Sequence, residues 1–427
     1  MSEAITCLQH EDEPPDHVAD IVIIGAGISG TLAATVLARG GYRVTIVDRY
    51  KEYPTDFRAE HLDGTQIDQF ARLGLLDDLT AGLYRGETVA CGRRGRLIEI
   101  GKTINFGLRY DQMVNIARRL MPTTVTSVIG RVVDVVTSDT IQQVRLADGH
   151  VLRGRLLIVA AGLGYALCRR LGITRKMVRE AHSLTFGFSI TPKDRAAFEH
   201  SYVVYQGEKV ADRIDYLALF RLGDQTRANL FTFRDYRDPW TTAFRADPAR
   251  CLKAALPGLT KLIGDFDVSG KVEVRAMDLY MSEGHVRDGV VLIGDAFQTA
   301  CPAAGTGITK ILTDIERLCL VHIPEWLRTD GIGQAKIAAF YNDPIKRACD
   351  AKSAHDAEYR RSVTIEPGLK WMIHRQQVHA RRRVRVLVSQ WIGSVGAWRT
   401  WNLPGLRAPG STVALGIMDR DNADHVI

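Results

Sequence analysis

Two kinds of hydrophobic pattern alternate near the start of the chain. Residues 20–24 form a short apolar run rich in β-branched side chains, which is typical of a buried parallel strand. Residues 31–39 then follow a helical pattern, which Gly40 and Gly41 end. A second apolar run follows at residues 43–47. This order predicts a strand, a helix and a second strand parallel to the first.

Glycines occupy the turn between the first strand and the helix. Gly25 permits a tight turn, Gly27 lets a pyrophosphate approach the backbone, and Gly30 lets the helix pack closely on the strand. The helix N-terminus presents free N–H groups to the phosphates. Asp48 ends the second strand, where its carboxylate can accept hydrogen bonds from ribose hydroxyls. The residues predicted to contact a dinucleotide are Gly25, Gly27, Ile28, Ser29, Gly30, Asp48 and Arg49.

A second glycine-containing motif lies far along the chain. Residues 288–296 read as a turn and a buried strand that ends in Gly294 and Asp295, and residues 301–307 lead into an apolar helix over 308–320. Together with the first motif, this segment resembles the p-hydroxybenzoate hydroxylase-like family of FAD-dependent monooxygenases (group A).

The resemblance implies that the dinucleotide is FAD and that Asp295 binds its ribityl chain. It also places the helix N-terminus at the flavin pyrimidine ring, where the helix dipole would stabilise the negative charge of the reduced flavin. The residues that it assigns to the cofactor are Gly294, Asp295, Pro302, Gly305, Thr306, Gly307 and Ile308.

Three further segments resemble the same family. Arg58 opens a stretch that ends in a short helix over 70–76, and the resemblance places this arginine near the flavin. Arg109 and Gln112 lie at the start of a helix, and the resemblance implies a polar contact from there to the ribityl chain or a phosphate. The third segment, 153–162, includes Gly162, which is assigned to FAD.

The third segment departs from the family at one position. The family has Asp-Gly where this chain has Ala161 and Gly162. That aspartate belongs to a motif linked to both FAD and nicotinamide binding. The departure leaves FAD binding intact and puts the family's mode of NAD(P)H docking in doubt.

Period-two alternation predicts several strands between the glycine motifs. Phe186, Phe188 and Ile190 would share one face of this sheet, and Phe231 and Phe233 would also share a face. These aromatic residues are interpreted as sheet core, with an apolar lid over the flavin ring as the alternative. The strands are predicted over 184–190, 201–206, 214–220 and 228–233.

These patterns predict an α/β fold with a Rossmann-type FAD-binding domain that is discontinuous in sequence. A β-sheet substrate domain is inserted into it, and a helical segment follows at the C-terminus. The FAD-binding domain is expected over 18–78, 102–180 and 272–345, the substrate domain over 79–101 and 181–271, and a basic, mainly helical segment over 346–427.

The resemblance implies a monooxygenase that uses NAD(P)H and O2. NAD(P)H would reduce the flavin, dioxygen would add at flavin C4a to give a hydroperoxide, and one oxygen atom would pass to an aromatic or apolar small molecule. Because the cofactor carries this chemistry, no catalytic residue is assigned. Two alternatives stay open, namely a reductase or dehydrogenase of the same fold that acts on a double bond, and a non-catalytic FAD-binding protein. A flavin halogenase is disfavoured because the chain has no WxWxIP motif.

Other candidate residues carry weaker signals. Cys301 adjoins the second glycine motif, but it has no partner cysteine at disulfide-reductase spacing, so a redox role is not favoured. His182 is interpreted as a structural histidine rather than a catalytic base. No histidine spacing fits a metal site, so no metal is predicted. The candidates for polar contacts to a substrate are Tyr202, Tyr205, Tyr216 and Arg234.

Composition bounds the class of protein. The chain of 427 residues is long enough for two or three domains, and its 46% hydrophobic and 25% charged residues are typical of a globular protein. No apolar run reaches the roughly 18 residues that a membrane span needs. The seven cysteines include no CxxC pair, and the first residues are acidic and polar, unlike a signal peptide. We therefore expect a cytoplasmic protein with a disordered tail before about Val18.

Positive charge is concentrated at the end of the chain. From Lys346 onward there are fourteen Lys and Arg residues against seven Asp and Glu, and this excess equals the net charge of +7. Apolar positions at helical spacing between 384 and 391 predict a helix with arginines on its other side. We expect this helix to dock on the FAD-binding domain, with contact to an anionic membrane surface as the alternative. No nucleic-acid partner is expected, and the oligomeric state is left open.

Overall fold

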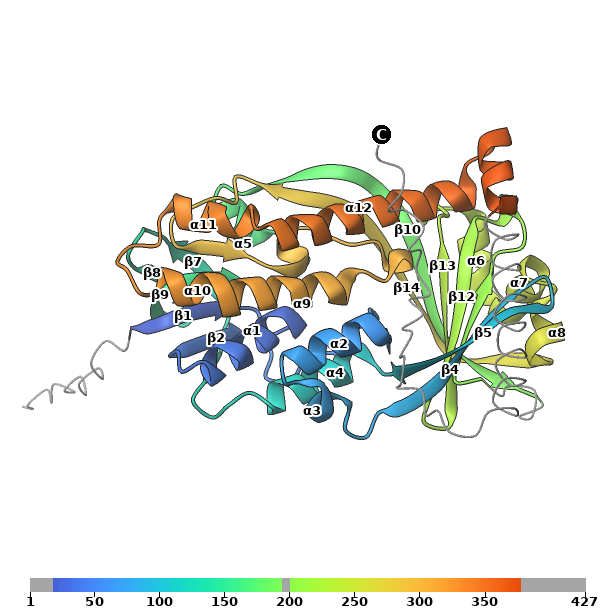
Figure 1. Cartoon of the computed structure of the whole chain (residues 1–427), viewed down its shortest axis with the longest axis horizontal. Coiled ribbons are helices and arrows are strands. Elements are labelled where there is room, and N and C mark those ends of the chain that lie inside the picture. The colour runs from blue at the N-terminus through green and yellow to red at the C-terminus, as the bar shows by residue number, and fades with distance from the viewer. Residues whose placement is uncertain (1–17, 194–199, 378–427) are drawn as a thin grey trace, which may run out of the picture.

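The computed structural model describes residues 18–193 and 200–377. Within these residues two β-sheets lie next to each other along the long axis of the molecule, and helices pack against both (Figure 1). The residues before Val18 and the helix expected around 384–391 lie outside the described part of the chain.

The first sheet has a parallel centre. β1 (Ala19–Ile24) lies between β2 (Val44–Asp48) and β9 (Val151–Val159), and all three strands are parallel. β6 (Thr126–Ile129) extends the sheet beyond β2. The first half of β9 pairs with the hairpin β7–β8, and its second half pairs with β15. These last strands are β7 (Val132–Val136), β8 (Gln142–Leu146) and β15 (Val290–Leu292).

The strand–helix–strand unit predicted at the start of the chain is confirmed. α1 (Ile28–Arg39) connects β1 to β2 and packs against β2. Ile21, Val22 and Ile23 have no exposed surface, which is why this strand reads as a continuous apolar run.

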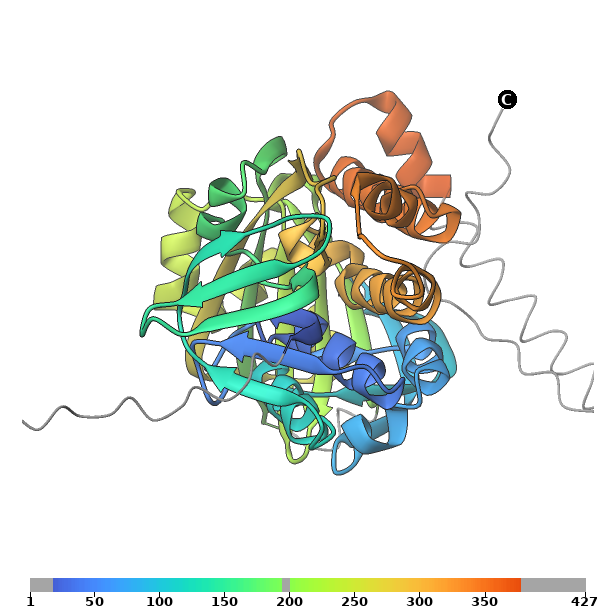
Figure 2. The same ribbon diagram turned by 90° about the vertical axis from the view of Figure 1, so that its left-hand side faces the viewer.

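Helices from the two ends of the described chain gather on one side of this sheet. In Figure 2 the orange helices lie on one side and the teal hairpin β7–β8 on the other. The helices are α2 (Gly64–Arg72), α3 (Leu76–Thr80), α4 (Tyr110–Arg119), α9 (Gly307–Arg317), α10 (Ile323–Trp326), α11 (Gln334–Tyr341) and α12 (Pro344–Ile365). The short helix α5 (Ala166–Arg170) instead contacts β7 of the hairpin.

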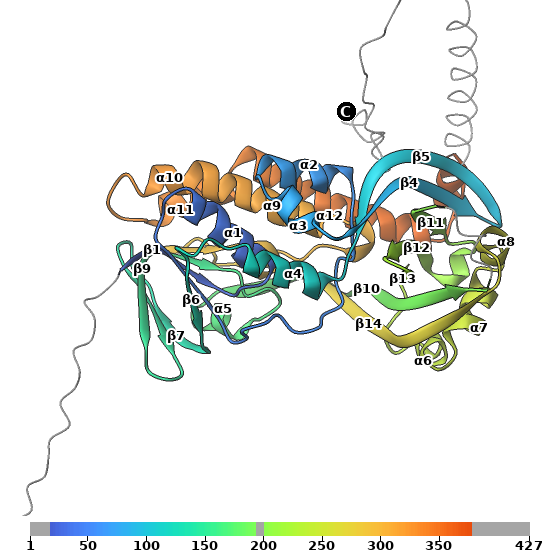
Figure 3. The ribbon, with the colours of Figure 1, turned by 90° about the horizontal axis from the view of Figure 1, so that it is seen from below.

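The second sheet is mainly antiparallel and strongly curved (Figure 3). Its strands follow the order β14-β10-β13-β12-β11-β4-β5-β3. The four strands predicted from period-two alternation correspond to β10 to β13, with Ser201 and Phe233 just outside β11 and β13. The bounds are β3 (His61–Leu62), β4 (Tyr84–Arg93), β5 (Arg96–Gly107), β10 (Thr174–Pro192), β11 (Tyr202–Gln206), β12 (Ile214–Leu222), β13 (Gln225–Thr232) and β14 (Phe266–Glu283).

Long strands pass without a break from one part of the molecule to the other. The expected domain boundaries near 101, 180 and 271 fall inside β5, β10 and β14. β10 and β14 pair along most of their length, and in Figure 1 they extend from the second sheet alongside the first. The division into an FAD-binding and a substrate domain therefore stays a prediction.

Helices cover one face of the second sheet. The helices are α6 (Pro239–Ala246), α7 (Pro248–Ala255) and α8 (Leu259–Ile263). Phe186 and Phe188 point toward them, with their ring centroids 4.8 Å and 5.6 Å from that of Phe244. Ile190 belongs to the same buried cluster, so the core interpretation is confirmed for these residues and the lid interpretation is wrong for them.

The opposite face of the second sheet is turned toward the interior of the molecule. Because side chains alternate along a strand, Thr185 lies on this face, next to Phe231 in the paired strand. Phe233 packs in a separate small cluster with Met277 and Ala357.

α12 connects the two parts of the molecule. The helix contacts α9, α11 and β12, so it spans from the first sheet to the second. Asp343 caps its N-terminus by accepting hydrogen bonds from the backbone N–H groups of Ile345 and Lys346. No helix in the described residues is both long enough and apolar enough to cross a membrane.

Candidate active site

A cavity of about 820 Å³ lies between the two sheets. The carboxyl ends of β1 and β2 open into it from one side, and the inner face of the second sheet closes the other. In open α/β sheets, ligands bind outside the carboxyl ends of the strands. The position of the cavity therefore follows from the strand order of the first sheet.

The glycine loop forms one wall of the cavity. Gly25 has a φ of +101°, and a Cβ there would lie 2.5 Å from the carbonyl oxygen of Ala160. A Cβ on Gly30 would lie 1.9 Å from the carbonyl oxygen of Gly25. By contrast, a Cβ on Gly27 would meet its nearest atom, on Tyr53, at 3.9 Å. Gly25 and Gly30 therefore allow the turn and the packing, while Gly27 leaves open space against the cavity.

Asp48 fixes the shape of this wall. Its carboxylate accepts hydrogen bonds from Ala26 N at 2.7 Å and from Tyr50 N at 2.9 Å. Arg118 Nη2 lies 3.3 Å from the same carboxylate. A carboxylate has about four acceptor positions, so Asp48 retains capacity for a hydroxyl group in the cavity.

Alternating charges connect the Gly294–Asp295 turn to the loop after β2. Arg58 Nη1 lies 2.7 Å from Asp295 Oδ2, and Arg58 Nε lies 2.7 Å from Asp56 Oδ2. Arg275 Nη1 donates to Asp56 Oδ1 at 2.9 Å. These four side chains line the cavity and balance in charge. Arg58, which the resemblance places near the flavin, therefore contacts the second glycine motif through Asp295.

The N-terminus of α9 points into the cavity. Gly305 has a φ of +67°, which turns the chain from a short 3₁₀ segment into the helix. Gly305, Gly307 and Ile308 all line the cavity. The first N–H groups of a helix have no partner within it. This end of α9 can therefore stabilise negative charge on a bound molecule.

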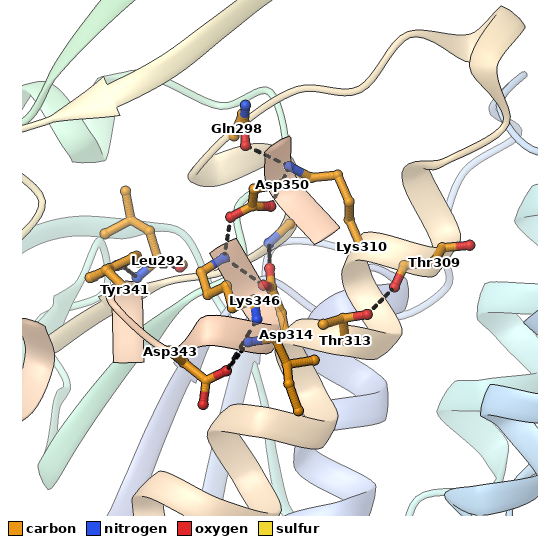
Figure 4. A network of polar contacts seen from close by, with 12 residues as sticks. Leu292, Gln298, Thr309, Lys310, Thr313, Asp314, Tyr341, Asp343, Lys346 and Asp350 are labelled. Carbon is orange, nitrogen blue, oxygen red and sulfur yellow. Dashed lines mark hydrogen bonds and ion pairs between the residues drawn. The ribbon is translucent and has the colours of Figure 1, made fainter. Parts of the chain in front are cut away.

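A buried charge network supports the Gly294–Asp295 turn from behind (Figure 4). Gly294 N donates to Asp314 Oδ2 at 3.0 Å. Asp314 Oδ1 accepts from Lys346 Nζ at 2.6 Å, and Lys346 also donates to Asp350 at 3.1 Å. Lys310 Nζ donates to the other oxygen of Asp350 at 2.7 Å. Through this network α12 holds α9 and the turn in one arrangement.

Lys346 is charged despite its burial. It is 1% exposed, and burial alone would lower its pKa. The carboxylates of Asp314 and Asp350 outweigh burial and raise the pKa of Lys346 above its ordinary value. The segment from residue 346, which the sequence predicts to be basic and mainly helical, therefore contributes a buried ion pair next to the site.

Most of the predicted cofactor residues line the cavity. Gly30, Gly294 and Thr306 lie behind the lining, and the Thr306 hydroxyl is 2.6 Å from Ser353 Oγ on α12. The lining residues are Gly25, Gly27, Ile28, Ser29, Asp48, Arg49, Arg58, Gly162, Asp295, Pro302, Gly305, Gly307 and Ile308.

Arg109 and Gln112 do not line the cavity. α4 begins at Tyr110, which does line it. Gln112 is two positions further along the helix, which places it on the opposite side, exposed to solvent. Arg109 forms ion pairs with Asp111 at 3.5 Å and Glu273 at 3.7 Å. A contact between either residue and the cofactor stays a prediction without support from this geometry.

Two of the four residues predicted to contact a substrate line the cavity, and two do not. Tyr202 and Tyr216 line the cavity. Tyr205 does not, because it lies on the covered face of the sheet and donates to Glu208 Oε1 at 2.5 Å. Arg234 lies over the ring of Trp240 at 4.4 Å and outside the lining.

Several lining residues were missed by the sequence reading. Glu60 and His61 follow Arg58 in the segment that was assigned to the flavin, and their place in that segment was the available signal. Thr185 and Asn229 are polar positions in otherwise apolar strands, which could have marked the inner face. Arg275 gave no sequence signal that we can identify.

Cys301 and His182 differ in position. Cys301 lines the cavity, is fully buried, and burial raises its pKa to about 11. It is therefore a thiol at neutral pH and a poor nucleophile. His182 is buried outside the lining, with its ring 5.5 Å from Phe233. Among the described residues, no group of three or more His, Cys, Asp and Glu side chains could hold a metal ion.

These residues fit an FAD molecule. The open face of Gly27 suits a pyrophosphate, and Asp48 suits a ribose. Asp295 and the N-terminus of α9 line the same cavity, where they could hold the rest of the cofactor. The cavity volume is within the usual range for cofactor sites, which is about 300–1,000 Å³.

The chain is similar in sequence to known proteins. Residues 18–321 match the protein family described as FAD binding domain. Squalene monooxygenase from Rattus norvegicus is 23% identical over 346 residues, which cover 76% of this chain and 58% of that protein. The chain therefore matches less than two thirds of the length of that relative.

Solved structures of other proteins share the fold. p-Nitrophenol 4-monooxygenase PnpA from Pseudomonas putida is 16% identical with a TM-score of 0.70, covering 91% of this chain and 99% of that one. PqsL from P. aeruginosa, in complex with 2-aminobenzoylacetate, is 19% identical with a TM-score of 0.65, covering 81% and 97%.

Proposed function

The chain belongs to the FAD binding domain family, and from this premise we propose that it is an FAD-dependent monooxygenase acting on an aromatic or other apolar small molecule. The observation that carries the proposal is that one cavity contains both the cofactor cradle and an aromatic wall. A molecule against that wall would meet the flavin away from bulk water. The wall consists of Tyr202, Tyr216, Ala218, Phe220, Phe231 and Met277.

In this proposal the protein residues bind and orient FAD and shield the reacting molecules from water. Gly27 and Asp48 would hold the adenosine half of FAD, while Asp295 and the start of α9 would hold the flavin half. Bound FAD supplies the transfer of electrons from a reductant to dioxygen. The curved sheet would keep water from the reacting molecules, as Phe231 and Met277 close that side of the cavity.

Three titratable side chains of the cavity are unsuited to act as a general base at neutral pH. Burial lowers the pKa of His61 to about 4, and burial raises the pKa of Tyr53 to about 12. With the Cys301 thiol also protonated, these three groups are neutral at pH 7. A general base works best with a pKa near the working pH, and none of these three groups meets that condition.

NAD(P)H is proposed as the reductant. Ala161 lines the cavity, and its methyl group stands where the family resemblance implies a carboxylate. We therefore expect slow reduction of the free protein by NADPH, and faster reduction with a bound ligand or a partner reductase. Fast reduction that saturates at micromolar NADPH without ligand would contradict this expectation.

Ala161 also supports a second candidate function, because altered nicotinamide handling is compatible with a reductase of the same fold. Oxygen dependence separates the two. NADPH would be given to the FAD-loaded protein with a panel of phenols or conjugated alkenes, with and without ¹⁸O2. A monooxygenase consumes NADPH only with oxygen and places one ¹⁸O atom in the product. Consumption without oxygen, coupled to alkene saturation, would favour the reductase, and absence of both would contradict both proposals.

The relatives' names agree with this proposal. Squalene monooxygenase and p-nitrophenol 4-monooxygenase are named for an apolar and an aromatic substrate. Their low identity to this chain leaves the substrate itself open.

A further inference from the structure

One carboxylate in the cavity has an oxygen atom that the protein does not use. The side chain of Glu60 is fully buried and lines the cavity. Its Oε2 accepts from Arg227 Nε at 2.8 Å. Turning the Asn229 amide so that its nitrogen faces Glu60 places that nitrogen 3.0 Å from the same oxygen. Within the described residues, Glu60 Oε1 has no hydrogen-bond partner.

A buried acceptor without a partner is costly for a folded protein. Such an atom therefore points to a ligand that completes it. Glu60 cannot turn away, because Arg227 and Asn229 hold Oε2 from the strand that forms the cavity wall. Oε1 is thus a fixed acceptor without a partner, in a side chain that lines the cavity.

Two neighbouring groups also lack partners. His61 Nε2 and Thr185 Oγ1 are buried atoms in the cavity lining without a hydrogen-bond partner among the described residues. The His61 ring stacks on Tyr202 with centroids 3.8 Å apart, so its position is fixed by the aromatic wall. Glu60, His61 and Thr185, which all line the cavity and have unpartnered polar atoms, are together called its polar end.

The charges around this polar end disfavour an anionic ligand. Arg227 is shared between Glu60 and Glu273, so two carboxylates face one guanidinium. Arg109 approaches Glu273 at 3.7 Å but also pairs with Asp111. These five groups carry a net charge of −1, counting three carboxylates and two arginines.

The arginines of the lining near the polar end are also occupied. Arg58 pairs with Asp56 and Asp295, and Arg275 pairs with Asp56. A carboxylate ligand would have to break one of these pairs or lie beside Glu60. Both options cost free energy in a buried site.

We propose that Glu60 is a specificity-determining residue whose Oε1 accepts a hydrogen bond from a hydroxyl or amino group of a neutral, largely apolar ligand, and that it excludes ligands with a carboxylate at that position. The inference rests on the proposed function only in regarding that ligand as the substrate. Binding itself requires neither a reductant nor oxygen.

Three ligands with the same ring system test which polar group the cavity accepts. The FAD-loaded full chain is titrated with 1-naphthol, naphthalene and 1-naphthoate, and binding is followed by the change in flavin absorbance. A hydrogen bond to a charged acceptor corresponds to roughly tenfold or more in affinity. The expected order is naphthol at least about tenfold tighter than naphthalene, with naphthoate the weakest.

Substitution of Glu60 makes the test specific. In Glu60→Gln, Arg227 should hold the amide oxygen, so the NH2 group would face the cavity in place of Oε1. That group can donate but cannot accept. We expect 1-naphthol to bind about tenfold more weakly and 1-naphthoate more tightly than in the wild type. The preference for naphthol over naphthoate should therefore become smaller or reverse.

Glu208→Gln is the matched control. Glu208 is also buried beside the second sheet, where it accepts from Tyr205 Oη at 2.5 Å and Gly258 N at 2.9 Å, but it does not line the cavity. Its replacement should leave the order of the three probes unchanged.

Several results would overturn the inference. They are equal or tighter binding of naphthoate than naphthol by the wild type, absence of naphthol binding, or unchanged naphthol affinity in Glu60→Gln. If Glu60→Gln does not fold, the order of the three probe affinities in the wild type decides the question. A protein that binds naphthol as expected but never oxygenates a ligand would contradict the proposed function and leave this inference standing.

Discussion

Gly27 is the loop glycine whose missing side chain leaves room against the cavity. We expect Gly27→Val to fold, because a Cβ there has no atom closer than 3.9 Å, and to lose FAD, because its methyl groups would occupy the place of the pyrophosphate. The purified variant should be colourless. Gly101→Val, at a strand position where a Cβ meets nothing within 4 Å, is the control and should stay yellow. A folded Gly27→Val protein with stoichiometric FAD would show that the pyrophosphate lies elsewhere.

The buried His182 side chain should make the free energy of unfolding depend on pH. Burial lowers its pKa to about 4 in the folded protein, against about 6.5 when unfolded. Between these values the unfolded chain binds more protons, so the free energy of unfolding falls as the pH falls from 6.5 toward 4. At pH 5 this loss is about 1–2 kcal/mol.

His182→Phe should remove that loss. Phenylalanine keeps an aromatic ring beside Phe233. Because both imidazole nitrogens lack hydrogen-bond partners in the described structure, the substitution should cost little stability at pH 8. Chemical unfolding at pH 8 and pH 5 gives the comparison. An equal fall in stability for wild type and variant would mean that His182 is not held neutral.

At the scale of the element, the turn before α9 sets the direction of the helix. Gly305 and Gly223 both have left-handed backbone, with φ of +67° and +57°, but Gly223 lies in a hairpin outside the cavity. Alanine at either position should cost about 1 kcal/mol of stability. Only Gly305→Ala should also lower the flavin potential, by about 10–40 mV, because α9 would be misaimed at the reduced flavin.

Redox titration of the two FAD-loaded variants measures this difference. If Gly305→Ala leaves the potential where Gly223→Ala leaves it, α9 does not face the flavin ring.

The buried network connects α12 to the site. Lys346→Met would leave Asp314 buried without its cation, so we expect a loss of about 3–5 kcal/mol of stability together with weaker FAD binding. Lys352→Met on the same helix removes an exposed pair with Asp356 and should cost about 0.5 kcal/mol or less. Equal effects of the two substitutions on unfolding and on FAD affinity would show that the network does not support the turn.

Elements with strong local patterns could be predicted from the sequence. The glycine loop, β15 with the Gly294–Asp295 turn, and α9 combine apolar runs with glycines whose spacing has a physical cause. The network of Lys346, Asp314 and Asp350 could not be predicted, because its members are charged residues whose burial depends on how α12 packs. The same holds for Glu60, whose orientation is set by Arg227, far along the chain.

At the scale of the whole molecule, the sequence predicted FAD and the α/β fold, and the family confirms both. The sequence did not predict which face of the second sheet lines the cavity. Period-two alternation shows that Phe186 and Thr185 face opposite sides, but not which side meets the cofactor. The structure assigns Thr185 to the cavity and Phe186 to the helices behind the sheet. The charged tail after residue 377 lies beyond what the structure describes.

The central claim is that this cavity lets a reduced flavin react with oxygen while the protein shields the reaction from water. Rapid mixing of the reduced, FAD-loaded protein with oxygenated buffer tests this most directly, with flavin absorbance recorded throughout. The account predicts reoxidation in at least two phases, with a spectrum between them that is neither reduced nor oxidised flavin and that persists longer when 1-naphthol is bound. Reoxidation in a single phase that releases all of the oxygen as hydrogen peroxide, with or without the ligand, would contradict it.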